Sequence, residues 1–154
     1  MGRSRILGAV AALCLAGCGT ECPSPVGTWT VDRPQAERLA ASWAEKEVAA
    51  APAGEQDAAR RRMQEMAAGM LKAELEATFA ADQTARLVVQ RDGEENVMEG
   101  TWAEAGDAIA VTPTASNGRP VPTREARRTI PFPCREGRLW FEVLVGLQVP
   151  LQRR

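Results

Sequence analysis

Short strand patterns separated by turn signals dominate the second half of the chain. Turn-forming pairs occur at Asp92-Gly93 and Gly106-Asp107, a loop around Asn117-Gly118 is expected at residues 114–122, and another turn is expected at residues 134–137. Between these points, apolar and polar side chains alternate over short stretches, as they do in half-buried strands. A series of short strands at intervals of about ten residues predicts an antiparallel sandwich or barrel.

One strand and one helix are predicted before this region. Residues 26–31 carry β-branched side chains around Trp29, which is typical of a strand. Asp32 supplies a side-chain oxygen suited to capping a helix, and Pro34 has the backbone angle of a first helical turn. The helical pattern then continues to about residue 50.

A second helix is predicted from about residue 55 into the mid-70s. Its apolar residues recur at helical spacing and predict a buried stripe, formed by Met63, Met66, Ala67, Met70 and Leu71. The two helices would form an insertion, about residues 33–75, after the first strand. The fold class predicted is therefore α+β.

The first 17 residues have the features of a leader. Arg3 and Arg5 form a basic head before an apolar run, residues 6–16, which is shorter than the roughly 20 residues that span a bilayer. The run ends in Leu15-Ala16-Gly17-Cys18, which resembles the lipobox of bacterial lipoproteins. The alternative is an ordinary secretory signal cut nearby.

The lipobox resemblance implies a processed and lipidated protein. Residues 1–17 would be the signal peptide, and the Cys18 thiol would carry a diacylglycerol through a thioether. Its freed amine would take a further acyl chain such as palmitate, so the protein would bind the membrane through this anchor. Gly19 stands where Asp signals inner-membrane retention in such lipoproteins. We therefore expect an outer-membrane anchor and a periplasmic domain.

Two cysteines remain for the mature domain. Cys14 leaves with the signal peptide and Cys18 is used by the lipid, which leaves Cys22 and Cys134. In an oxidising compartment an even pair predicts a disulfide, here between the mature N-terminus and the region before the last strands. Two unrelated thiols are the alternative. Residues 18–25 would form a lipidated tether.

The predicted strands resemble lipocalin-like domains of bacterial envelope proteins. The resemblance lies in Gly27-Thr28-Trp29, in residues 79–84, in a second Gly-x-Trp at Gly100-Thr101-Trp102, and in the final strands. It implies that residues 26–154 form a small antiparallel barrel or half-barrel with a two-helix insertion. Gln83 departs from the pattern, which usually has Gly there.

The same resemblance implies a basic residue over the first-strand tryptophan. Arg153 or Arg154 would make a cation–π contact with Trp29. The alternative is a solvated arginine tail at the end of the chain.

Composition excludes several functions. The chain has no His and no Tyr, which removes Ser-His and Cys-His catalysis and imidazole zinc sites. Without Arg3 and Arg5, 17 basic residues stand against 20 acidic ones, so nucleic acid is not an expected partner. We predict no enzymatic activity, no catalytic residue, no cofactor and no metal.

Four further sets of side chains are candidate sites. The thioethers of Met63, Met66 and Met70 could bind Cu(I), but helix packing is the favoured interpretation. A group of arginines could meet anionic head groups, although a solvated rim is favoured; these are Arg119, Arg124, Arg127, Arg128, Arg135 and Arg138. Nothing in the sequence supports acid/base chemistry at Glu94-Glu95, or a nucleophile at Ser42 or Ser116.

The sequence thus predicts a non-enzymatic binding module for a small apolar ligand or lipid. This hypothesis requires an apolar cavity that Trp43, Met66 and Met70 do not fill. The alternative is a structural or stress-related envelope interaction protein, with a filled barrel and an exposed apolar patch. The pattern does not identify ligand-binding residues.

Overall fold

A computed structural model describes residues 22–122, 124 and 128–154. Its elements are β1 (Gly27–Val31), α1 (Arg33–Ala50), α2 (Gln56–Leu71), β2 (Glu74–Phe79), β3 (Thr84–Arg91), β4 (Glu94–Ala105), β5 (Ala108–Ser116), β6 (Arg119–Pro120), β7 (Ile130–Arg135), β8 (Arg138–Leu144) and β9 (Leu147–Arg153).

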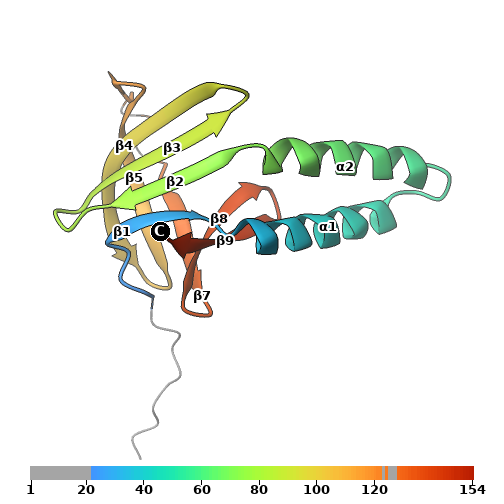
Figure 1. The fold of residues 1–154 in the computed structure, drawn as a ribbon, viewed down its shortest axis with the longest axis horizontal. Helices are drawn as coiled ribbons and strands as arrows, with labels where there is room; N and C mark the ends of the chain where they lie inside the picture. Colours follow the sequence, from blue (N-terminus) through green and yellow to red (C-terminus); the bar gives the residue numbers. More distant parts are fainter. Residues whose placement is uncertain (1–21, 123, 125–127) are drawn as a thin grey trace, which may run out of the picture.

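The strands form a closed antiparallel barrel (Figure 1). Around the barrel the order is β1, β2, β3, β4, β5, β7, β8 and β9, and β9 pairs with β1 through Trp29 and Arg153. The short strand β6 pairs only with β5. Closure removes the exposed edges that an open sheet would present. The α+β prediction is confirmed, as a barrel rather than a half-barrel.

The two helices form a hairpin that projects from one end of the barrel (Figure 1). The Asp32 carboxylate accepts a hydrogen bond from the Gln35 backbone N–H at 3.3 Å and so caps α1, as predicted. With 18 residues, α1 is about 27 Å long at 1.5 Å per residue. No helix in the described ranges is long and apolar enough to cross a membrane.

The helices pack through small side chains, which corrects the predicted apolar stripe of the second helix at Met66 but not at Ala67, Met70 and Leu71. The buried residues of α1 are Ala36, Ala40, Ala44 and Val48, and those of α2 are Ala59 and Ala67. Met66 is 42% exposed. Met66 therefore lies away from the contact between the helices, whereas Met70 is half-buried against the cluster of Ala40, Ala67 and Leu147.

Aromatic side chains fill the barrel interior. Phe79 and Phe132 are buried and meet edge to face, with ring centroids 5.4 Å apart, and Trp102 also meets Phe79 edge to face, at 6.3 Å. A second, smaller cluster around Ala40, Ala67 and Leu147 joins the hairpin to the barrel. The barrel is therefore a packed core over much of its length.

Both tryptophans of the repeated Gly-x-Trp pattern hold a neighbouring segment. Trp29 Nε1 donates to the Pro25 carbonyl at 2.7 Å, and Trp102 Nε1 donates to the Ala80 carbonyl at 2.9 Å. The guanidinium carbon of Arg153 lies 5.3 Å from the centre of the Trp29 ring, so Arg153 makes the expected cation–π contact. Arg154 instead pairs with Glu76.

The turn between β2 and β3 is well formed despite Gln83. Gln83 adopts a positive φ of 66°, and its carbonyl accepts from the Trp102 backbone N–H. Asp82 accepts hydrogen bonds from the Thr84 hydroxyl and backbone N–H, and these bonds, the hydroxyl first, lower the pKa of Asp82. A residue other than Gly therefore fits this turn.

The predicted disulfide is present. Cys22 and Cys134 are joined, with their Cα atoms 5.2 Å apart and 112 positions apart in sequence. Cys134 is buried in the barrel core, and Cys22 packs against the same cluster. The bond fixes the start of the described chain to the barrel.

Candidate ligand-binding site

The hairpin leaves the barrel at the end where β1 finishes and β2 begins. Only Asp32 separates β1 from α1, and only Lys72 and Ala73 separate α2 from β2. The first turns of α1 and the last turns of α2 therefore lie next to this end of the barrel (Figure 1). We call it the mouth.

An apolar cavity of about 200 Å³ lies at the mouth, and we call it the mouth cavity. Strands β1, β2, β3, β8 and β9 and both helices contribute to its wall. The lining residues are Val31, Arg33, Ala36, Ala40, Met70, Leu71, Ala73, Leu75, Val89, Arg91, Phe141, Val143, Leu147 and Val149.

The cavity ends on the packed core of the barrel. Phe141 lines it and stacks against the buried Phe132, with ring centroids 5.4 Å apart. Trp43 packs at the base of the hairpin instead of filling the cavity, and Met70 forms part of the wall. A ligand could therefore enter the mouth but could not pass through the barrel.

Two arginines are the only charged residues among those that line the mouth cavity. Arg33 is the first residue of α1, and Arg91 is the last residue of β3. Since β2 lies between β1 and β3, the two arginines flank the start of β2. No carboxylate is among the described lining residues.

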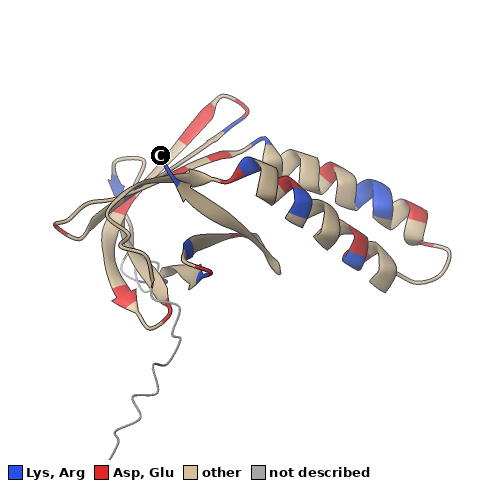
Figure 2. Cartoon of the chain, turned by 60° about the horizontal axis from the view of Figure 1, so that its bottom comes forward, with Lys and Arg blue, Asp and Glu red and all other residues tan. Residues whose placement is uncertain are grey.

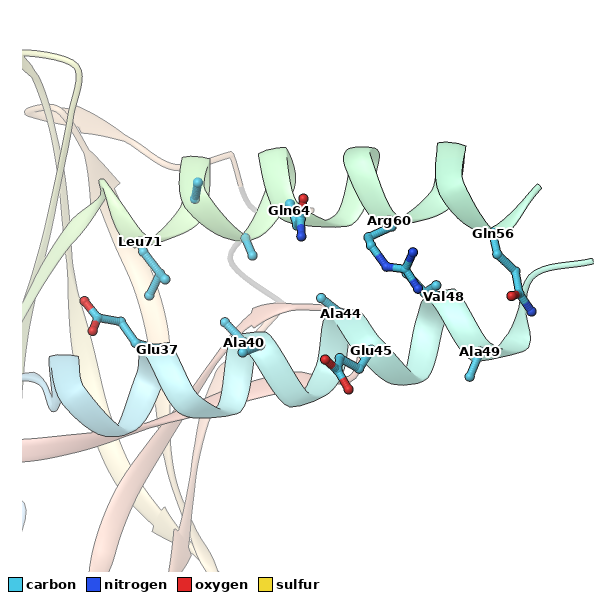
Figure 3. A pocket seen from close by; sticks show the side chains of 13 residues that line it. Glu37, Ala40, Ala44, Glu45, Val48, Ala49, Gln56, Arg60, Gln64 and Leu71 are labelled. Carbon is cyan, nitrogen blue, oxygen red and sulfur yellow. The ribbon is translucent and has the colours of Figure 1, made fainter. Parts of the chain in front are cut away.

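A second hollow of about 700 Å³ runs between the two helices (Figure 3). Alanine is the most frequent residue in its wall, but Glu37 and Glu45 border it from α1, and Arg60 points toward α1 from α2. Ala40 and Leu71 line both this groove and the mouth cavity. Charges of both signs also alternate along the outer surfaces of the helices (Figure 2). Because the groove is bordered by mixed charges, it is less suited to an apolar ligand than the mouth cavity.

The sequence candidates do not converge on one site. Cys18 and Arg127 lie outside the described residues. Among the three methionines considered for copper, Met70 lines the mouth cavity and Met66 is exposed. Within the described ranges, no group of three His, Cys, Asp or Glu side chains could hold a metal ion.

The charged and hydroxyl candidates are dispersed and exposed. Arg138 pairs with Asp32 at 2.9 Å, and Gln90 donates to Glu95 beside the β3–β4 turn. The exposed residues comprise the arginines at 119, 124, 128, 135 and 138, together with Ser42, Glu94, Glu95 and Ser116. Their exposure favours the solvated-rim interpretation of the arginines.

Sequence reasoning missed Arg33 and Arg91. One local signal was available, because Arg33 begins a helix whose first turn contains no acidic residue. A cation at a helix N-terminus is unfavourable, since the helix dipole is positive at that end. An arginine at this position is therefore expected where a second role, such as ligand binding, outweighs the unfavourable interaction with the helix dipole. Arg91 carried no comparable local signal.

Comparison with protein-family models, with curated proteins and with solved structures gave no match.

Proposed function

We propose that this protein is a lipid-anchored outer-membrane lipoprotein whose periplasmic domain binds a small apolar ligand or lipid without catalysing a reaction. The mouth cavity carries the proposal, because it is a largely apolar hollow beside a filled barrel core. Apolar cavities with a few placed polar groups are the usual form of small-molecule sites.

The volume of the cavity limits the size of its ligand. At about 200 Å³ it exceeds the roughly 150 Å³ of an engineered cavity that binds benzene, but it is smaller than most drug-sized sites. The ligand is therefore a small molecule, or one end of a longer chain. A two-chain lipid could place only part of one chain inside.

Several features support a lipocalin-like assignment of the barrel. Successive strands pair up and down around a closed barrel, and Arg153 covers Trp29 at the end remote from the hairpin. Arg153 also donates to the carbonyls of Ser24 and Val26, so it holds the segment before β1 across that end. The helical hairpin between β1 and β2 is the principal departure from a simple lipocalin-like meander.

The lipid anchor is proposed from the lipobox. Cys18 precedes the disulfide-bonded Cys22 by four positions, which is at most about 14 Å of extended chain. A lipid on Cys18 would therefore hold the domain close to the bilayer. The described chain begins away from the hairpin (Figure 1), so this anchor would leave the mouth accessible.

Intact mass measurement tests the anchor. Protein extracted from membranes should begin at Cys18 and carry a diacylglycerol thioether and an N-linked acyl chain, while a Cys18→Ala variant should lack this added mass. A free thiol at Cys18, or a chain that still begins at Met1, would overturn the lipoprotein proposal.

Filling the mouth cavity should abolish ligand binding. Val143 lines the cavity, whereas Val145 is 93% exposed two residues further along, so Val143→Phe and Val145→Phe are a matched pair. Every described element lies after residue 21, so the chain from residue 19, with its disulfide formed, is suitable for titration. We expect Val143→Phe to weaken binding of 1-dodecanol at least tenfold, and Val145→Phe to leave it unchanged.

The same titration separates the proposal from its alternative. An envelope interaction protein with a filled core remains the second candidate, because the barrel interior is packed and Val145 presents an apolar side chain at the β8–β9 turn. If the native chain binds no apolar probe, the binding function is wrong and the interaction role is favoured. Equal binding by both phenylalanine variants would place the ligand outside the mouth cavity.

A further inference from the structure

The two charged residues that line the mouth cavity are both cationic. Its described lining contains Arg33 and Arg91 and no acidic residue, although the whole chain has slightly more acidic than basic residues. An apolar cavity for a neutral ligand does not require two cations at its border. Two cations and no anion in the lining favour a ligand that carries negative charge.

Most of the N–H donors of the Arg33 guanidinium make no hydrogen bond to the described residues. Its guanidinium makes one long hydrogen bond, 3.5 Å, to the Ala73 carbonyl, and it has no ion pair within the described residues. A guanidinium offers five N–H donors, so most of them remain free for a ligand. Arg33 also borders a polar hollow on the outer barrel surface with Glu74 and Glu95, but neither carboxylate is within ion-pair distance.

Arg91 is held loosely on the other side of β2. Its ion pair with Asp92 is 3.4 Å long and both side chains are largely exposed, a type of pair that stabilises little. A guanidinium nitrogen lies 3.8 Å from the position that a Cβ would take on Gly69, so Arg91 rests against the last turns of α2. This places its charge beside the hairpin, over the mouth.

We propose that the ligand is a single-chain amphiphile with an anionic head group, bound by Arg33 and Arg91 while its chain enters the mouth cavity. This inference rests on the proposed binding function. Guanidinium groups suit carboxylates and phosphates because both accept paired, charge-assisted hydrogen bonds. Ala73, at the start of β2, presents a small side chain between the two arginines and leaves space for the head group.

Titration with probes that share one chain and differ in head group tests the inference. The probes are dodecanoate and dodecyl phosphate, each below its critical micelle concentration, and 1-dodecanol below its solubility limit, added to the chain from residue 19. We expect at least one anionic probe to bind about tenfold or more tightly than the alcohol, because only the anionic head groups accept charge-assisted hydrogen bonds from both arginines. The tighter anion shows whether the natural head group is a carboxylate or a phosphate.

Paired variants separate the role of these arginines from net charge. Arg33→Gln with Arg91→Gln should weaken the preferred anion about tenfold or more and leave the alcohol unchanged. Arg33→Lys with Arg91→Lys should retain most of the anion's affinity. The control, Arg61→Gln with Arg62→Gln, removes the same charge from exposed positions of α2 that do not line the cavity and should change neither.

The outcomes distinguish failure of the head-group inference from failure of the proposed binding function. If the alcohol binds as tightly as both anions, or if the Arg33 and Arg91 glutamine variant binds them like the native chain, the head-group inference is wrong and the apolar site remains. If no probe binds the native chain, the binding function itself fails. An unchanged thermal unfolding midpoint shows that each variant is folded.

Discussion

Replacing Cys22 and Cys134 by alanine should lower the free energy of unfolding by about 4–5 kcal/mol. The disulfide joins positions 112 residues apart, and the loss of a loop of this length from the unfolded chain predicts an effect of that size. The bond also fixes the segment before β1, whose Pro25 carbonyl accepts the hydrogen bond from Trp29. Denaturant unfolding of the native and variant chains measures the difference.

Reduction of the native chain provides the control for this prediction. It breaks the same bond but keeps both sulfur atoms, and the buried Cys134 would continue to pack in the core. Reduced protein and the double alanine variant should therefore show similar losses, with the alanine variant slightly less stable. A loss below about 1 kcal/mol would contradict the loop-entropy argument. It would also show that Arg153 and Trp29 suffice to hold the segment before β1.

Local features of the fold could be predicted because neighbouring residues determine them. The turn expected at Asp92-Gly93 is present, and the loop expected at residues 114–122 is shorter, a turn at Asn117-Gly118 between β5 and β6; all four residues have positive φ angles. The cap at Asp32 and the break between the helices likewise depend on short-range chemistry. Boundaries shifted by a few residues, as for α2, which ends at Leu71 rather than in the mid-70s.

Features that depend on register could not be resolved from sequence. Arg153 and Arg154 were equal candidates for the contact with Trp29. Pairing of β1 with β9 sets Arg153 opposite Trp29, and Arg154 then reaches Glu76. Long-range strand pairing therefore determines which of the two arginines contacts Trp29.

The mouth cavity also could not be predicted from sequence, because it too depends on long-range packing. Five strands and two helices form its wall, and Arg33 and Arg91 lie far apart in the chain. The predicted apolar stripe of α2 is right at Ala67, Met70 and Leu71 and wrong at Met66, while the buried face of α1 consists of alanines at four-residue spacing. Judged by hydrophobicity alone, the larger methionine side chains were expected to be the buried ones.

Gly100→Ala should destabilise the fold by about 3 kcal/mol, within the range for overpacking a closed core. A Cβ at this position would clash with the Thr112 carbonyl oxygen and would lie 3.0 Å from the carbonyl carbon. These are backbone atoms of β5, so relief would require the β4 and β5 strands to separate. The site also carries the register shift between Glu99 and Gly100, where the pairing is already irregular.

Gly69→Ala is the matched control, since the same methyl group is added without a backbone clash. The nearest atom outside α2 is a guanidinium nitrogen of Arg91 at 3.8 Å, an ordinary contact, and alanine favours a helix over glycine by roughly 0.5–1 kcal/mol. Thermal unfolding should therefore shift in opposite directions for the two variants. If Gly100→Ala unfolds like the native chain, the close approach of β4 to β5 is wrong. Gly100 would then be required for a reason other than space. Gly27, the glycine of the first Gly-x-Trp, is such a case, because it has a positive φ of 133°.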